Sequence, residues 1–310
     1  MQKSRPLLFS VQSYHYLRDE LLKLTGYAAG EVEHKQFPDG EIYQRLLSPV
    51  SERDVILLGG TVDDATTLEL YDLASAMVMG GARSLTLVIP YYGYSTMERA
   101  VKPGEVVKAK TRARLLSSIP QAAIRNKIIL LDLHTEGIPY YFERDLRTAH
   151  LYAKTVIIET ARRLCGDNFV LACTDAGRAK WVESLANDIG VQASFVFKRR
   201  LDGEHTEITG VSAWVKDQDV LIYDDMIRTG GSMIKAAQAY LEAGARSIQA
   251  ITTHGIFPGN SLEKLEKCGH FQHLVATNSH PRAQALKGDF LETVSLAPVF
   301  AEYLGGMFGE

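Results

Sequence analysis

Short apolar runs alternate with longer segments of helical periodicity along the whole chain. The runs are rich in Val, Ile and Leu and end at polar or turn-forming residues, as buried strands do. They predict strands at residues 6–10, 54–59, 84–90, 127–131, 168–172, 194–197, 220–223, 247–253, 274–277 and 290–295. Segments of helical period predict helices at residues 14–24, 65–79, 148–165, 233–243 and 296–304.

The order of these elements predicts the fold class. Strands that alternate with helices form mainly parallel sheets with helices on both faces. A chain of 310 residues is long for one domain and natural for two, and both halves repeat the order without a long linker. We therefore predict an α/β fold of two tandem, doubly wound, mainly parallel-sheet domains, residues 1–146 and 147–310. Two placements of the last helix stay open: on the second half, or back on the first.

Composition narrows the classes of function. The apolar fraction of 46% is that of a globular protein, and a net charge of −3 gives no basis for binding nucleic acid or an anionic membrane. The three cysteines are too few and too scattered for a disulfide framework or a zinc site. We find no signal peptide and no long apolar run, so we expect a soluble, cytoplasmic protein.

Residues 220–257 carry most of the candidate chemistry. Asp224 and Asp225 follow a predicted strand, and a Thr-Gly-Gly-Ser turn at 229–232 opens the next helix. Backbone N–H groups, hydroxyls and the helix dipole make such a turn a phosphate cradle. The two carboxylates suit a diol or a hydrated Mg²⁺. Together they predict a sugar phosphate ligand, although a lone turn of this kind also fits an ordinary strand-to-helix connection with solvated aspartates.

This stretch resembles the ribose-phosphate-binding signature of type I phosphoribosyltransferases. More narrowly it is similar to the ribose-phosphate pyrophosphokinase family, whose usual pattern is DDMxDTGGT, a helix and THGxF. The resemblance covers essentially the whole chain and implies two domains of phosphoribosyltransferase type. It implies that ribose and its phosphate are bound by Asp224, Asp225, Arg228, Thr229, Gly230, Gly231 and Ser232, where Arg228 departs from the usual aspartate.

The same resemblance assigns a nucleotide to the first half. Residues 37–42 read FPDGEI, which on composition alone predicts a hairpin tip with solvated acids. In the family this loop crosses a subunit interface to reach ATP. That implies nucleotide roles for Phe37, Asp39 and Glu41, and a homo-oligomer with an inter-subunit nucleotide site.

A second segment matches the family's nucleotide-binding sequence only in part. Residues 88–94 resemble the family's IPYFGYAR, and Arg99 matches the end of the ARQDR continuation. Thr96 and Met97 stand where the family has charged or amide contacts to the nucleotide. The nucleotide pocket implied by the resemblance is therefore recognisable but altered.

Two further strand ends carry polar residues. His134 follows the strand at 127–131 and, taken alone, is also compatible with an ordinary core histidine. The resemblance implies that His134 and Asp175 hold Mg²⁺-ATP, with Asp175, Ala176, Gly177 and Arg178 as the diphosphate loop. Glycine is usual at position 178, so Arg178 either blocks close approach of the backbone or adds a phosphate contact.

A Lys-Arg-Arg run at 198–200 follows the strand at 194–197. Most such runs are solvated basic loops. In the family the run opens a loop that folds over the transferred phosphates, which implies that Lys198 and Arg200 stabilise charge in the transition state.

These assignments give a leading hypothesis and two alternatives. The chain would be a Mg²⁺-dependent pyrophosphokinase that moves the β,γ-diphosphate of ATP to ribose 5-phosphate and releases AMP. The extra positive charge of Arg178 and Arg228 favours an acceptor with a larger 5′ substituent, such as ADP-ribose. The altered residues Thr96, Met97 and Arg228 would also fit a catalytically silent regulatory homologue.

Overall fold

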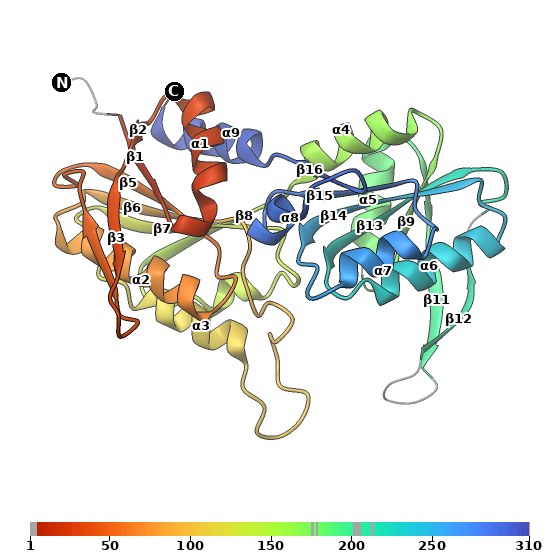
Figure 1. Cartoon of the computed structure of the whole chain (residues 1–310), viewed down its shortest axis with the longest axis horizontal. Coiled ribbons are helices and arrows are strands. Elements are labelled where there is room, and N and C mark those ends of the chain that lie inside the picture. The colour runs from red at the N-terminus through yellow and green to blue at the C-terminus, as the bar shows by residue number, and fades with distance from the viewer. Residues whose placement is uncertain (1–4, 175–176, 178, 201–205, 212–213, 310) are drawn as a thin grey trace. The chain divides into compact units, whose positions relative to one another are not determined.

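The computed structural model describes residues 5–174, 177, 179–200, 206–211 and 214–309. The chain divides into two compact units. The first comprises the chain up to Tyr152 together with the segment from Ala297 onward, and the second runs from Ala153 to Leu296. Both are α/β units, as the sequence predicts (Figure 1).

The first unit is built on a parallel sheet. Its central strands are buried along most of their length, which is why they read as nearly continuous apolar runs. In spatial order the strands are β2 (Ala28–Ala29), β1 (Leu7–Ser10), β5 (Asp54–Leu58), β6 (Ser84–Ile89), β7 (Arg125–Leu131) and β8 (Leu146–Leu151). Figure 1 shows α1 (His15–Thr25) and α9 (Ala297–Phe308) on one side of this sheet, and α2 (Asp64–Met79) and α3 (Lys108–Ser117) on the other.

The second unit repeats this plan. Its parallel strands are, in spatial order, β10 (Gln192–Ser194), β9 (Val170–Cys173), β13 (Asp219–Ile227), β14 (Ser247–Gly255), β15 (His273–Thr277) and β16 (Leu291–Val294). Its helices are α4 (Lys154–Cys165), α5 (Ala179–Ile189), α6 (Gly231–Glu242), α7 (Ser261–Lys267) and α8 (Pro281–Leu286).

Each unit also carries an antiparallel hairpin at the same place in its order of strands. The first unit has β3 (Val32–Gln36) and β4 (Ile42–Leu46) just before β5. The second has β11 (Val196–Arg200) and β12 (Thr206–Val211) just before β13. The two halves of the chain are therefore tandem versions of one fold.

The same set of polar contacts lies at the start of the central pair of strands in each unit. In the first, Arg83 donates from Nε to Oδ1 of Asp54 over 3.0 Å and from Nη2 to Oδ2, and Ser84 donates to Oδ1 over 2.6 Å. Burial by itself raises the pKa of Asp54, but the hydrogen bonds from Arg83 and Ser84 outweigh it and leave that pKa below its ordinary value. We call this arrangement the Asp-Arg-Ser clamp.

The second clamp has the same geometry in the other unit. Arg246 donates from Nε to Oδ1 of Asp219 over 2.9 Å and from Nη2 to Oδ2, and Ser247 donates to Oδ1 over 2.5 Å. Both clamps join the first residues of paired strands, since Asp54 pairs with Ser84 and Asp219 with Ser247.

Some predicted elements differ from the structure, and one open placement is settled by it. The predicted strand at 194–197 is divided between the end of β10 and the start of β11, which belong to different sheets. Residues 148–151 belong to β8, and α4 begins only at Lys154, so a helix starting at Thr148 was wrong. The last helix, α9, belongs to the first unit, where it packs against α1.

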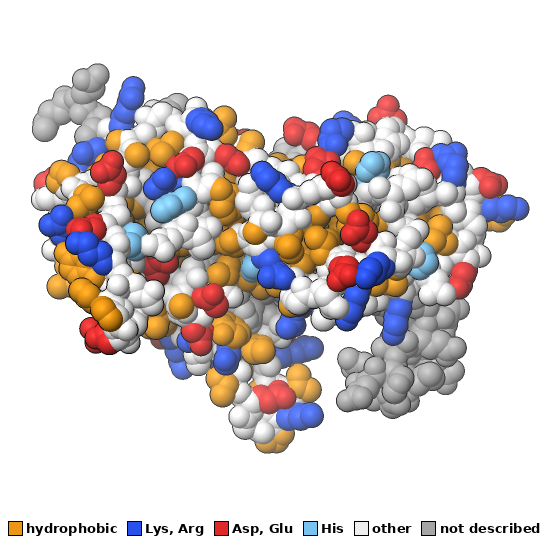
Figure 2. Space-filling view, in the orientation of Figure 1, with side chains coloured by type: hydrophobic (Ala, Val, Ile, Leu, Met, Phe, Trp, Pro, Cys, Tyr) orange, Lys and Arg blue, Asp and Glu red, His pale blue; other side chains and the backbone are white. Residues whose placement is uncertain are grey.

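The surface is mixed in charge. Lys and Arg side chains lie among Asp and Glu side chains on the face shown in Figure 2. Within the described part of the chain, no helix is both long enough and apolar enough to cross a bilayer.

Candidate functional site

The turn after β13 has the geometry of a phosphate loop. Gly230 adopts a left-handed conformation with φ of 79° and directly precedes α6. A Cβ at Gly230 would lie 2.8 Å from Cγ of Leu265, so both the conformation and the packing require glycine. Thr229, Gly231 and Ser232 are exposed at the start of α6, where the first backbone N–H groups have no partner within the helix. These donors suit an anion.

Asp224 and Asp225 lie inside β13, which continues past the point where the sequence pattern ended the strand. Adjacent side chains of a strand point to opposite faces of the sheet. Asp224 shares its face with Ile222, which packs in the core that includes residues of α6. Asp225 shares the other face with Tyr223 and is 4% exposed. Only Asp224 therefore lies on the same face of the sheet as α6.

A contact from the neighbouring strand fixes Asp224. Thr174, just beyond β9, donates from Oγ1 to Oδ2 of Asp224 over 2.8 Å, and the backbone N–H of Asp225 donates to Oδ1 over 3.0 Å. Thr174 directly precedes the predicted diphosphate loop. It was missing from the sequence-based site, and its only signal was its position beside Asp175.

Part of the predicted site lies outside the described residues. This holds for Asp175, Ala176 and Arg178, while Gly177 between them is exposed. The backbone of Lys198 and Arg200 lies in β11, and their side chains are not among those that the structure describes.

A buried polar network supports the carboxyl ends of β14 and β15. His254 contacts Oγ of Ser279 through Nδ1 over 2.8 Å, and Ser279 and Thr277 both donate to the carbonyl oxygen of Thr253, over 2.8 and 2.6 Å. All four residues are at most 2% exposed. The network fixes the loops beside the phosphate turn and was not among the candidate site residues.

In the first unit, Phe37, Asp39 and Glu41 form the tip of the β3–β4 hairpin. The tip is closed by the N–H of Phe37 donating to the carbonyl of Glu41 over 2.8 Å, and the N–H of Glu41 donates to Oδ1 of Asp39 over 3.1 Å. Phe37 is 46% exposed, although its ring packs edge-on against Tyr43 at 6.3 Å. An aromatic ring presented on a rigid hairpin tip can stack on a planar ligand.

The segment after β6 is held by a polar cluster around Tyr94. Tyr94 has a positive φ of 59°, and its hydroxyl donates to Oδ1 of Asp64 over 2.8 Å. Arg112 donates from Nη2 to the same oxygen over 2.6 Å, and Lys108 lies 4.5 Å from the centre of the Tyr94 ring. Arg99 is exposed and pairs with Glu98 at 3.5 Å.

His134 is partly buried in the loop after β7. That loop is fixed by His150 of β8, whose Nε2 accepts a hydrogen bond from the N–H of Leu133 over 3.0 Å. Burial lowers the pKa of His150, against an opposing effect of Glu136, and so favours the neutral ring that can accept this hydrogen bond.

The described side chains do not by themselves form a metal site. No group of three or more His, Cys, Asp or Glu residues among them is arranged to hold a metal ion. Mg²⁺ is usually bound through one or two carboxylates together with substrate phosphates. The partly exposed carboxylate of Asp224 is an oxygen donor of the kind that this ion takes.

Comparisons with known proteins agree over both units. A family model described as the N-terminal domain of ribose phosphate pyrophosphokinase matches residues 7–119, and one described as the phosphoribosyl synthetase-associated domain matches residues 190–309. A ribose-phosphate pyrophosphokinase of Helicobacter pylori is 31% identical over 300 residues, covering 96% of this chain and 91% of that protein. One of Chlorobaculum tepidum is 32% identical over 277 residues, covering 88% and 82%.

A solved structure extends the likeness to the fold. The crystal structure of phosphoribosylpyrophosphate synthetase from Mycobacterium smegmatis matches with a TM-score of 0.87 at 25% identity, and covers 98% of this chain and 99% of that one. Tandem units of one fold, the acidic strand with its phosphate turn, and relatives matched over nearly their whole length lead to one conclusion. The chain belongs to the ribose-phosphate pyrophosphokinase family of transferases.

Proposed function

We propose that this chain is a Mg²⁺-dependent enzyme that transfers the β,γ-diphosphate of ATP to the anomeric hydroxyl of ribose 5-phosphate. The anomeric oxygen forms a bond to the β-phosphorus, and the bond from that phosphorus to the oxygen bridging it to the α-phosphorus breaks. AMP leaves with the bridging oxygen, the hydroxyl proton passes to solvent, and the second product is phosphoribosyl pyrophosphate. The observation that most supports this proposal is Asp224 on the same face of the sheet as the phosphate turn.

The second unit would hold the acceptor. The N–H groups and hydroxyls of Thr229, Gly231 and Ser232 would bind the 5-phosphate at the start of α6. Asp224, held by Thr174, would bind the ribose hydroxyls directly or through the metal ion. The side chain of Asp225 lies on the other face of the sheet, and it would support the site by fixing the end of β13.

The first unit would bind ATP. Phe37 would stack on the adenine, with Asp39, Glu41 and Arg99 as polar contacts, and the hairpin tip would serve the site of a neighbouring copy in a homo-oligomer. His134 and Asp175 would hold Mg²⁺ with the phosphates. When bound, Mg²⁺ would neutralise charge on the transferred phosphates, and Lys198 and Arg200 would do the same from the β11 side. A cytoplasmic location belongs to the same proposal.

The proposal is tested by following product mass and AMP together. Incubation with ATP, Mg²⁺ and ribose 5-phosphate should give AMP and a product heavier than the acceptor by one diphosphate. Asp224→Asn should lower kcat/KM by a factor on the order of 100 or more, because the carboxylate charge is lost at the reacting sugar. Glu263→Gln, which changes an exposed side chain of α7, is the matched control and should leave the rate unchanged. ATP binding without AMP formation would instead favour a catalytically silent homologue.

A second acceptor is favoured by one residue. Arg228 is exposed directly after β13 and next to Thr229, so it adds positive charge where the 5′ end of the acceptor would lie. That charge would suit an acceptor with further phosphate, such as ADP-ribose. Acceptor competition with the unmodified chain decides between the two, because a strong preference for ribose 5-phosphate there would remove the ADP-ribose alternative.

A further inference from the structure

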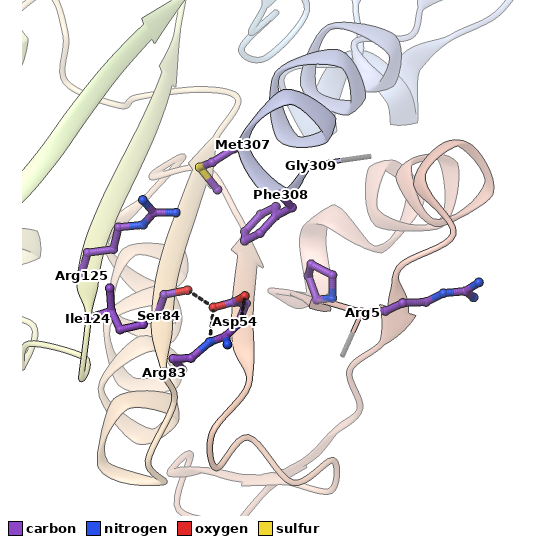
Figure 3. Close-up of a pocket in the computed structure, with 10 residues that line it drawn as sticks. Arg5, Asp54, Arg83, Ser84, Ile124, Arg125, Met307, Phe308 and Gly309 are labelled. Atoms are coloured by element: carbon purple, nitrogen blue, oxygen red, sulfur yellow. Dashed lines mark hydrogen bonds and ion pairs between the residues drawn. The ribbon is translucent and has the colours of Figure 1, made fainter. Parts of the chain in front are cut away.

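A pocket of about 400 Å³ lies at the amino ends of the strands of the first unit, at the edge of the sheet opposite to the loops after β6 and β7. Its walls come from the starts of β5, β6 and β7 and from the last turn of α9 (Figure 3). We call it the amino-edge pocket. The residues that matter for its chemistry are Asp54, Arg83, Arg125, Met307 and Phe308.

The acid of this pocket is already neutralised. Both carboxylate oxygens of Asp54 accept hydrogen bonds from Arg83, and Ser84 adds a third. Arg83 uses only Nε and one N–H of Nη2 in this contact, so its remaining N–H groups are available. Among the described residues no hydrogen bond or ion pair engages the guanidinium of Arg125, although its charge helps to lower the pKa of Asp54. The pocket therefore keeps a surplus of positive charge.

The second unit repeats the fold of the first, so a comparison of the two shows which residues of the pocket the fold itself requires. Both units have the Asp-Arg-Ser clamp, so the clamp accounts for Asp54, Arg83 and Ser84. It does not account for Arg125, which stands opposite Ser84 in the strand register. In the second unit the pairing of Gln249 with His273, continued back by two residues, puts Phe271 opposite Ser247.

The two counterparts differ in chemistry. Phe271 is 8% exposed and packs in the hydrophobic core, so the second unit closes this place with an apolar ring. The first unit has a cation beside a cavity at the same place. The fold therefore does not require a cation at the position of Arg125.

Figure 3 shows the shape that such a ligand would meet. The side chain of Arg125 extends toward Met307 and Phe308, and the clamp residues lie next to them. The guanidinium of Arg5, which also lines the pocket, is directed away from it. The Phe308 ring is itself fixed by an edge-on contact to Tyr27 at 6.0 Å. A rigid aromatic and thioether wall beside an unengaged guanidinium suits an anion that carries a flat apolar group.

We propose that the amino-edge pocket binds a small organic oxyanion, a phosphate or a carboxylate. Its charged group pairs with Arg125 and the remaining N–H groups of Arg83, and its apolar part lies on Met307 and Phe308. A ligand there does not compete with substrates at the opposite edge of the sheet. It contacts the start of β7, whose other end leads to His134.

The experiment uses the full chain with phenyl phosphate and benzoate as probes and benzyl alcohol as the neutral analogue. Hydrogen exchange locates binding, and thermal shift gives its strength. The two anions should protect peptides that cover residues 120–128 and 300–309, and the alcohol should not. Arg125→Gln should weaken binding of the anions about tenfold or more, because a charge-assisted pair is lost. Comparing the two anions tells whether the pocket prefers phosphate or carboxylate.

Arg114→Gln is the matched control, since Arg114 lies in the same unit, is exposed and pairs with Glu143. It should bind the probes like the unmodified chain. The proposal is overturned if neither anion protects these peptides, or if Arg125→Gln binds the anions as well as Arg114→Gln does. If Arg125→Gln does not fold, Arg125→Lys, which keeps the charge and loses the fork geometry, replaces it. Because the positive charge is kept, Arg125→Lys should weaken anion binding by less than the roughly tenfold expected for Arg125→Gln. Protection of the same peptides by the neutral alcohol, as strong as that by the anions, would also refute the proposal.

Discussion

Thr174, just beyond the end of β9, donates a hydrogen bond of 2.8 Å from Oγ1 to Oδ2 of Asp224 in the neighbouring strand β13. The contact is made where β9 has ended and β13 continues. It links the start of the predicted diphosphate loop to the carboxylate that we assign to the ribose. A single hydroxyl thus connects two parts of the proposed site that lie 50 residues apart in the sequence.

Thr174→Val removes this hydroxyl with little change in shape. The loss of one hydrogen bond to a carboxylate should lower kcat/KM for ribose 5-phosphate by roughly 3- to 10-fold. Steady-state kinetics with the acceptor varied would measure it. Thr174→Ser keeps the hydroxyl and should stay within about twofold of the unmodified enzyme. Equal rates for Val and Ser would mean that the contact does not position Asp224.

Gly230→Ala should disable the phosphate turn. The substitution puts a Cβ into a left-handed backbone and 2.8 Å from Leu265, so we expect a loss of about 1 to 3 kcal/mol in the free energy of unfolding. Urea denaturation measures it. Gly231→Ala is the neighbouring control, because its Cβ would meet open space within α6, and its stability should be unchanged or higher by up to about 1 kcal/mol.

Asp54→Asn should change how the free energy of unfolding depends on pH, because it removes the negative charge of the clamp. The pKa of Asp54 is lower in the folded state than in the unfolded chain, so its contribution is fully present above the unfolded pKa of about 3.9 and is lost as pH falls through the folded value. We expect the variant to be less stable by roughly 1 to 2 kcal/mol at pH 5 to 7. The difference should shrink below about pH 4, and a difference that persists at pH 2 would contradict this account.

His150 should make the loop before His134 sensitive to mild acid. Burial lowers the pKa of His150 in the folded state, so the neutral form is favoured there. The contribution of the neutral His150 ring to the free energy of unfolding is fully present above the unfolded pKa of about 6.5. It is lost as pH falls below that value. Protonation also removes the acceptor for the N–H of Leu133. The free energy of unfolding should fall between about pH 6.5 and 5, and His150→Gln should flatten this dependence.

Phe37→Ala tests the hairpin tip without disturbing the fold. Phe37 is 46% exposed, so the melting temperature should hardly change. If the ring stacks on adenine, KM for ATP should rise roughly tenfold or more, with KM for ribose 5-phosphate little affected. Tyr140→Ala, which removes a ring that is 87% exposed, is the control. A normal KM for ATP in Phe37→Ala would remove the stacking role.

The sequence predicted the two parallel sheets because their strands are apolar on both faces. It failed at β8, an edge strand whose residues 146–151 read LRTAHL and are nowhere fully buried. An edge strand needs no continuous apolar run, so this one was read as the start of a helix. The place of α9 was open for another reason, since a helical pattern gives an apolar face but not the sheet that it covers.

The sequence predicted which residues form the candidate site, but not how their side chains are arranged in space. The turn at 229–232 could be read directly, because Gly230 has one conformation that suits it. The separation of Asp224 and Asp225 onto two faces could not, because it depends on how far β13 continues beside β14. Thr174 was missed because a hydroxyl contact between strands leaves no spacing signal in the chain.

The Asp-Arg-Ser clamp occurs once in each half, at the sheet edge that lies away from the substrate loops. Such a matching pair is what remains when one ancestral segment is copied and fused to itself. The two units differ at the opposite edge of their sheets, where we propose a nucleotide site in one and a sugar-phosphate site in the other, while this anchor is the same in both.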